Sequence, residues 1–189
     1  MTSLADTVIK IGGGLLAVPD ALDHVVRTLR STYATKRRLL IVPGGGPFAN
    51  AVRDVDAAMP LDASAAHWMA ILGMDQYAYL LTSRLPHARF TDRLEELASI
   101  HGTDALPVFA PYRLLRAVDP LPHGWDVTSD SIAAWISHHI GATRLILIKT
   151  SVAISSKAVV DSYFHRLLDD QLRVSIVDPH ALPAALAKI

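Results

Sequence analysis

Two glycine triplets, each directly after a short apolar run, are the residues of this chain best suited to chemistry. They are Gly12, Gly13, Gly14, Gly44, Gly45 and Gly46. Because glycine has no Cβ, the backbone N–H groups of such a loop can close around an anion. Lys10 lies on the run before the first triplet. Two such loops and a lysine predict a site that holds two phosphate-bearing groups face to face, as phosphoryl transfer requires.

Two common phosphate-binding motifs fit these triplets poorly. Gly44, Gly46 and Ala49 match the spacing of the dinucleotide-binding fingerprint, which also needs a second strand ending in an acidic residue about 20 positions later. Residues 62–74 have a helical pattern instead. A P-loop ends in Gly-Lys-Ser or Gly-Lys-Thr, and neither triplet does. The alternative that the glycines only make tight turns stays open.

Polar residues near the triplets and near a later helix start are further candidates. Arg53 lies about two turns into the helix expected after the second triplet, where it could bind a phosphate through two hydrogen bonds or simply be solvated. Asn50 is a weaker candidate on the same rim. Asp130 follows Thr128 and Ser129 at an expected helix start. A carboxylate there suits N-capping, and the capped helix tip would also be a rigid platform for a reaction.

The elements that must position these residues alternate between strand and helix. Short runs that are apolar on both faces, typical of strands covered on both sides, occupy 8–11, 39–42, 106–109, 145–148 and 174–177. Helical patterns occupy 21–30, 47–59, 63–84, 92–100, 131–140, 163–171 and 179–188. This alternation predicts an α/β fold: one domain over residues 1–189, built as a three-layer α/β/α sandwich with a mainly parallel sheet. Both glycine loops should lie at the C-terminal edge of that sheet.

The expected helix 63–84 is apolar nearly all round. A surface helix shows a polar face, so a second subunit is expected to cover this one in a homodimer or higher homo-oligomer. Full burial within one chain is the alternative. Asp75 lies in this helix and, because an unpaired buried carboxylate is costly, it should have a polar partner or a ligand.

Composition removes several classes of function. Lysine plus arginine and aspartate plus glutamate both number 18, which gives no electrostatic case for nucleic acid or an anionic membrane. Cysteine is absent, which removes thiolate chemistry and disulfides. No apolar run is long enough to span a membrane and no signal peptide is visible, so a cytoplasmic protein is expected. The nine histidines are scattered, and no dedicated protein metal site is predicted.

Three motifs together carry a family resemblance. KIGGG at 10–14, PGGGPFAN at 43–50 and WDVTSDS at 125–131 resemble the amino acid kinase superfamily, which includes carbamate, acetylglutamate, aspartate and uridylate kinases. With GMDQYA at 73–78 and TSDSIAAW at 128–135, the chain most resembles a short branch, the (aminomethyl)furanyl-methyl phosphate kinases of methanofuran biosynthesis. The resemblance covers nearly the whole chain.

The resemblance implies a role for each candidate. ATP with Mg²⁺ held mainly by its phosphates would phosphorylate a small phosphate monoester to a diphosphate. Catalysis would fall to Lys10, to Asp130 as the organiser of the lysines, and to Lys157 as the second lysine with Lys149 as reserve. The nucleotide would lie against Gly12, Gly13, Gly14, Lys149, Thr150 and Ser151. The acceptor would lie against Gly44, Gly45, Gly46, Asn50, Arg53, Asp75, Thr128 and Ser129, with His123 and Trp125 as possible walls.

The chain departs from the family pattern after the expected strand 145–148. Relatives carry an Asp-Gly stretch and a long loop there, whereas residues 149–157 lack Asp-Gly and the next helix is expected early. Two alternatives therefore remain: a small-oxoanion binding or storage protein on the same fold, and a non-catalytic partner subunit.

Overall fold

Six parallel strands form one sheet in the computed structural model, which describes residues 3–32, 38–103, 105–155 and 159–188. The strand order is β3-β4-β2-β1-β5-β6. The strands are β1 (Thr7–Ile11), β2 (Leu39–Pro43), β3 (Ala88–Thr91), β4 (Leu106–Phe109), β5 (Arg144–Ile148) and β6 (Arg173–Val177). β1 lies at the centre, paired with β2 on one side and β5 on the other.

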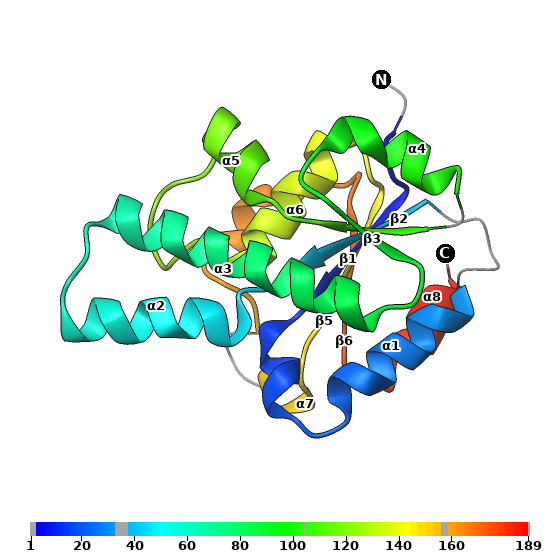
Figure 1. Cartoon of the computed structure of the whole chain (residues 1–189), viewed down its shortest axis with the longest axis horizontal. Helices are drawn as coiled ribbons and strands as arrows, with labels where there is room; N and C mark the ends of the chain where they lie inside the picture. Colours follow the sequence, from blue (N-terminus) through cyan, green and yellow to red (C-terminus); the bar gives the residue numbers. More distant parts are fainter. Residues whose placement is uncertain (1–2, 33–37, 104, 156–158, 189) are drawn as a thin grey trace.

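Helices cover both faces of this sheet (Figure 1). They are α1 (Ala21–Thr32), α2 (Gly46–Ala58), α3 (Ala63–Arg84), α4 (Leu97–His101), α5 (Tyr112–Val118), α6 (Ser129–His139), α7 (Ser151–Ile154) and α8 (Leu182–Ala187). The described residues also form the 3₁₀ helices η1 (Gly13–Ala17), η3 (Leu94–Glu96) and η4 (Phe164–Leu167). α6 packs on one face of the sheet, and α1 and α8 pack on the other.

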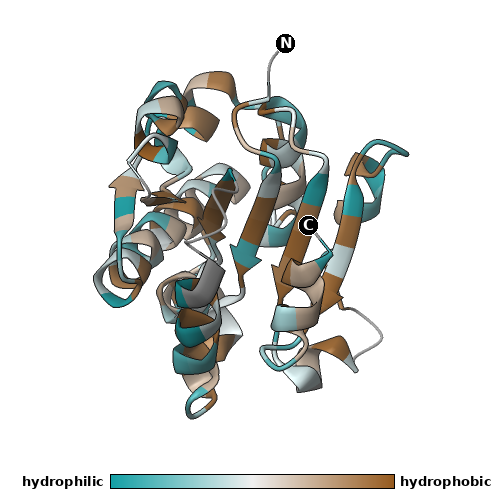
Figure 2. Cartoon of the chain, turned by 90° about the vertical axis from the view of Figure 1, so that its right-hand side faces the viewer, coloured by the Kyte–Doolittle hydropathy of each residue, from teal (hydrophilic) through white to brown (hydrophobic). Residues whose placement is uncertain are grey.

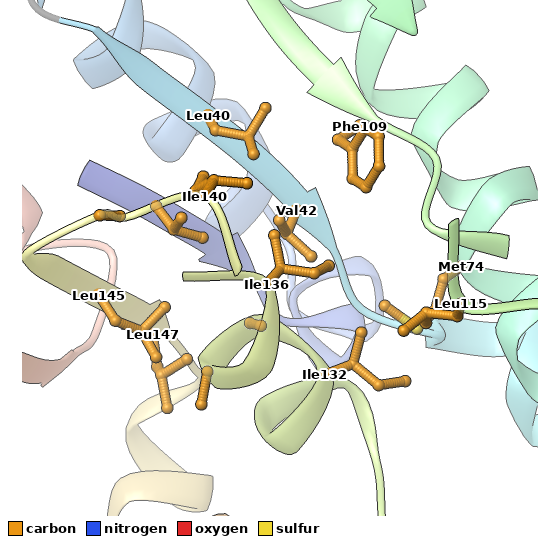
Figure 3. Packing of buried hydrophobic residues seen from close by; sticks show 14 of the residues in the cluster. Leu40, Val42, Met74, Phe109, Leu115, Ile132, Ile136, Ile140, Leu145 and Leu147 are labelled. Atoms are coloured by element: carbon orange, nitrogen blue, oxygen red, sulfur yellow. The ribbon is translucent and has the colours of Figure 1, made fainter. Parts of the chain in front are cut away.

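Side-chain alternation along the strands produces two separate cores. In β1, Val8 faces the α6 side, whereas Ile9 and Ile11 face the α1 side. Figure 3 shows the first core, where side chains of β2 and β5 lie against those of α6. Figure 2 shows apolar stretches in most of the strands, and β1, β2 and β4 are buried throughout, as cover on both faces requires. By the same alternation, Lys10 lies on the α6 side of β1, two residues after Val8.

Helix α3 takes part in both cores, which explains its apolar character. Ile71 and Met74 join the α6-side core, and Tyr77 and Leu81 join the other. α2 lies alongside α3 (Figure 1), and a Cβ at Gly73 would lie 2.9 Å from the backbone nitrogen of Ala49. Three apolar side chains of α3 remain exposed within the chain: Met69, Leu72 and Tyr79.

The expected α/β/α sandwich is confirmed, and three local expectations are corrected. β3 was not expected, because it is a half-exposed edge strand that contains Arg89 rather than an apolar run. α5 was not expected either. The helix expected over 163–171 is wrong, since only the 3₁₀ turn Phe164–Leu167 forms there. Among the described residues, no helix is long and apolar enough to cross a membrane.

Candidate active site

The two glycine loops touch each other at the carboxyl ends of β1 and β2. These strands are parallel neighbours, and the backbone nitrogen of Gly44 donates a hydrogen bond of 2.8 Å to the carbonyl oxygen of Ile11. A Cβ on Gly13 would lie 2.1 Å from both the Cα and the nitrogen of Gly46, which itself has φ +57. The glycines are therefore needed for packing. The same packing leaves bare backbone at the sheet edge where anions bind in α/β folds.

One buried carboxylate holds two lysines beside these loops. Asp130 Oδ1 accepts a hydrogen bond from Lys10 Nζ at 2.8 Å, and Asp130 Oδ2 accepts one from Lys149 Nζ at 2.6 Å. The side chains of Lys10 and Asp130 are each 5% exposed and that of Lys149 is 13% exposed. Lys149 follows β5 with the alternation of Leu145 and Leu147, so it emerges on the α6 side as Lys10 does.

The charges of this triad keep its carboxylate ionised. Burial raises the pKa of Asp130, but the charges and hydrogen bonds of Lys10 and Lys149 outweigh burial and lower it below its ordinary value. The pKa of Lys149 is lowered by burial and by the charge of Lys10, against the opposing effects of Asp130 and Asp161. Two ammonium groups share one carboxylate, so the triad carries net positive charge toward the cavity.

Asp161 holds the start of α6, a role that was not expected from the sequence. Its Oδ2 accepts hydrogen bonds from the backbone nitrogen of Thr128 at 3.0 Å, the hydroxyl of Thr128 at 2.7 Å and the backbone nitrogen of Ser131 at 3.1 Å. Its Oδ1 accepts from the hydroxyl of Ser131 and the backbone nitrogen of Phe164. The helix turn that carries Asp130 is thereby fixed from about 30 residues away along the chain. No local sequence signal marks Asp161.

A cavity of about 300 Å³ opens beside the triad. The expected site residues that line it are Lys10, Gly13, Gly14, Gly45, Gly46, Asn50, Arg53, Thr128, Ser129, Asp130 and Lys149. Gly12 and Gly44 lie behind it in the backbone packing, where a Cβ on Gly12 would be 2.5 Å from the carbonyl oxygen of Ile148.

The far end of the cavity is apolar and aromatic. Ile71, Met74, Trp125 and His67 contribute to its walls. The guanidinium of Arg53 lies 4.5 Å from the centre of the Trp125 ring. The indole nitrogen of Trp125 donates a hydrogen bond of 2.7 Å to Asp56 Oδ2, which ties the loop before α6 to α2. His67 was not singled out from the sequence.

Four expected site residues lie elsewhere. Thr150 and Ser151 border a second cavity of about 270 Å³ between η1, α1 and the segment after β6. Asp75 does not line the main cavity; its Oδ1 accepts a hydrogen bond of 3.1 Å from the backbone nitrogen of Tyr112 at the start of α5. That contact supplies the polar partner that burial demands. Lys157 lies outside the described residues.

Mg²⁺ finds no fitting ligand set in the described part of the chain. The carboxylate oxygens of Asp130 and Asp161 already accept hydrogen bonds from lysines, hydroxyls or backbone nitrogens. No group of three or more histidine, cysteine, aspartate or glutamate side chains could hold a metal ion there. We therefore derive no step through a protein-bound metal.

Comparison with known proteins identifies the family of this chain. The model of the amino acid kinase family matches residues 7–158; the chain belongs to the amino acid kinase family, as the three motifs indicated. A curated relative, [5-(aminomethyl)furan-3-yl]methyl phosphate kinase of Methanocaldococcus jannaschii, is 29% identical over 140 residues, or 74% of this chain. The match spans 63% of that relative's length.

Solved structures share the fold. Uridylate kinase from Archaeoglobus fulgidus aligns with a TM-score of 0.67 and 15% identity, over 96% of this chain and 95% of that one. UMP kinase from Bacillus anthracis aligns with a TM-score of 0.71 and 14% identity, over 95% and 91%. At such identities these structures establish the fold only.

Proposed function

We propose that this chain is a kinase that transfers the γ-phosphoryl group of ATP to a phosphate oxygen of a small phosphate monoester. The products are a diphosphate and ADP. One observation carries the proposal: Lys10 and Lys149 are held by the single carboxylate of Asp130, directly beside two touching glycine loops. Such a site offers positioning and positive charge, which are the main requirements of phosphoryl transfer.

The reaction is a direct in-line displacement. The second pKa of a phosphate monoester is about 6. The attacking phosphate oxygen is therefore already ionised at neutral pH and needs no general base. That oxygen forms a bond to the γ-phosphorus as the bond from the γ-phosphorus to the bridging oxygen breaks and ADP leaves. Lys10 and Lys149 stabilise the charge on the transferred group. Asp130 stays ionised and orients the two lysines.

The two cavities suggest where each substrate lies. The acceptor phosphate is placed at Gly45, Gly46 and the start of α2, where backbone N–H groups point outward. Asn50, Arg53, Thr128 and Ser129 also line that cavity. The nucleotide is placed along Gly13 and Gly14 toward Thr150 and Ser151, with Mg²⁺ carried by its phosphates.

The acceptor proposed is an (aminomethyl)furanyl-methyl phosphate. The name of the curated relative from M. jannaschii suggests this compound. The mixed character of the cavity supports it, because a small ring needs apolar walls such as Ile71 and Met74, next to a cationic phosphate site.

The test is an assay of ADP release with a panel of acceptors: the furan phosphate above, UMP, acetylglutamate and carbamate. We expect turnover with the furan phosphate and at least about 100-fold lower kcat/KM with the others. If only UMP supports turnover, the acceptor is UMP and not the furan phosphate. Tight binding of an oxoanion such as molybdate without ADP release from any acceptor would instead support the binding-protein alternative.

We also propose that α3 forms a subunit contact. Met69, Leu72 and Tyr79 are 38%, 42% and 64% exposed on it, and Tyr79 stacks on Phe90 at 4.2 Å to extend the apolar area onto β3. Burial of such side chains between two copies stabilises a dimer. Sedimentation should show a dimer or larger assembly at micromolar concentration that Leu72→Glu dissociates. A wild-type monomer would contradict the contact.

A further inference from the structure

His67 is the polar side chain of the main cavity that the proposed transfer leaves without a role. It lies in the first two turns of α3, is 6% exposed, and lines the cavity. Within the described part of the chain, its imidazole makes no hydrogen bond; its contacts are with rings. It stacks on His123 with ring centroids 4.5 Å apart and meets the edge of Trp68 at 5.1 Å. The fully buried, unpaired side-chain atoms of the described residues do not include the His67 nitrogens, so these nitrogens are open to the cavity and to a ligand in it.

The ring stack fixes the position of the His67 imidazole. His123 is held on both nitrogens, by the hydroxyl of Ser64 at 2.6 Å and by Asp119 Oδ1 at 2.8 Å. A ring packed against this anchored partner has little rotational freedom, so its nitrogens are presented at a fixed place. Preorganised groups of this kind discriminate between ligands better than mobile ones.

His67 lies far enough from the second glycine loop to meet the end of a bound acceptor that is opposite its phosphate. Gly73 of α3 faces Ala49, in the first turn of α2 beside the second glycine loop. His67 precedes Gly73 by six residues, which corresponds to about 9 Å along the helix. An acceptor whose phosphate binds at the glycine loop therefore points its other end at His67, past Ile71.

The charges around the cavity differ between the end with the lysines and the end with His67. The phosphate end has the ammonium groups of Lys10 and Lys149 and the carboxylate of Asp130. Two carboxylates and two guanidiniums lie around the His67 end: Asp119 bonded to His123, Asp56 bonded to Trp125, Arg53 over the Trp125 ring and Arg116 over the Trp68 ring. These four charges balance, so this end has no net positive charge that would repel a cation on the ligand.

The imidazole of His67 is in the form that accepts a hydrogen bond. Burial, with a further contribution from His123 and against the charge of Asp119, lowers its pKa to about 4. A neutral imidazole has one nitrogen free to accept and does not repel an ammonium group.

We infer that His67 is a specificity residue that accepts a hydrogen bond from an amino group at the end of the acceptor opposite the phosphate. This inference rests on the proposed function for the orientation of the acceptor. The ligand class is a phosphate monoester that carries a protonated primary amine across a small ring. His67 takes no part in phosphoryl transfer and acts on binding.

The test compares two ligands that differ only in this group. They are [5-(aminomethyl)furan-3-yl]methyl phosphate and the analogue with an ethyl group in place of the aminomethyl group. Calorimetry measures the affinity of each for the wild-type protein, for His67→Phe and for His67→Gln. Loss of one hydrogen bond to a charged group lowers affinity by about 10- to 100-fold. We expect the wild-type protein to bind the ligand with the amine at least about 10-fold more tightly than the ethyl analogue.

The variants locate that preference. His67→Phe should bind the two ligands within about 3-fold of each other, while His67→Gln, which retains an acceptor oxygen, should recover part of the preference for the amine. His139→Phe is the matched control, because His139 is exposed and stacks on Trp135 away from the cavity; it should keep the full preference. Thermal unfolding of each variant confirms that it is folded.

Equal affinity of the wild-type protein for both ligands would overturn the inference, as would a full preference in His67→Phe. Binding is measured without turnover, so the result is separate from the kinase proposal. If the amine is preferred through His67 but no diphosphate forms with ATP, the proposed function fails and the specificity role stands. If diphosphate forms equally well from both ligands, the proposed function stands and the specificity role of His67 fails.

Discussion

Lys149 donates a hydrogen bond of 2.6 Å to Asp130 Oδ2, on the carboxylate whose other oxygen accepts Lys10. The two lysines come from the ends of β5 and β1, which are parallel neighbours, and the carboxylate comes from the start of α6. One aspartate therefore sets the distance between two cations on separate strands. This geometry favours Lys149 as the second lysine of the proposed reaction.

Removing Lys149 should slow the reaction more than removing Lys157. Lys149→Ala deletes a preorganised donor, which typically costs about 10²-fold in kcat, and should change the KM of the acceptor little. Lys157→Ala should stay within about 3-fold of wild type if Lys149 fills the role. Steady-state assays of ADP release measure both. The opposite ranking would restore Lys157, the residue first expected from the sequence.

The sequence predicts Lys10 as a site residue, but it does not show that Lys149 pairs with Asp130. Both follow from strand alternation: Lys10 shares a face with Val8, and Lys149 shares one with Leu147. The end of β5 coincides with the segment where the chain departs from its relatives, so the motif gave no guide to which lysine matters. Only the contact with Asp130 distinguishes Lys149.

The rest of the site depends on contacts between residues far apart in the sequence, which sequence patterns do not reveal. Asp161 binds Thr128 and Ser131 across about 30 residues, and no periodicity or motif reports such a contact. His67 is one of nine histidines in the sequence; its burial against His123 depends on how the loop before α6 folds back on α3. The glycine loops were predicted correctly at one sheet edge because parallel strands with apolar faces fix that edge.

The contact between the two glycine loops predicts different responses at neighbouring glycines. In Gly13→Ala the new Cβ would lie 2.1 Å from the backbone of Gly46, so the loops must separate, and overpacking of this kind costs about 1–3 kcal/mol or more. Gly14→Ala is the matched control, because its Cβ would meet only Thr150 Cγ2 at 3.7 Å, an ordinary contact. Urea unfolding should show a large loss of stability for the first variant alone. Equal losses would contradict the loop contact.

The carboxyl of Asp75 should make stability depend on pH. Burial raises its pKa from 3.8 to about 7, although the hydrogen bond from the backbone of Tyr112 opposes the shift. A group with a raised pKa in the folded state contributes stability that is complete below the unfolded pKa and is lost as the pH rises through the folded pKa. Asp75→Asn stays neutral, so its free energy of unfolding should rise relative to wild type between about pH 4 and pH 7.

Urea unfolding of wild type and Asp75→Asn at several pH values across this range measures the effect. Asp170→Asn, at an exposed aspartate, serves as the control and should parallel wild type throughout. A difference between Asp75→Asn and wild type that does not change with pH would show that Asp75 titrates normally in the folded chain.

In the proposed reaction the chain joins two phosphates, and Lys10 stabilises the transferred group. Phosphorus NMR of the wild-type protein with ATP, Mg²⁺ and the furan phosphate should show ADP and the two coupled signals of a new diphosphate in equal amounts. Lys10→Ala should form that diphosphate at least about 10²-fold more slowly, while the exposed control Lys188→Ala should match wild type. Release of inorganic phosphate without a diphosphate, or undiminished diphosphate formation by Lys10→Ala, would contradict the account.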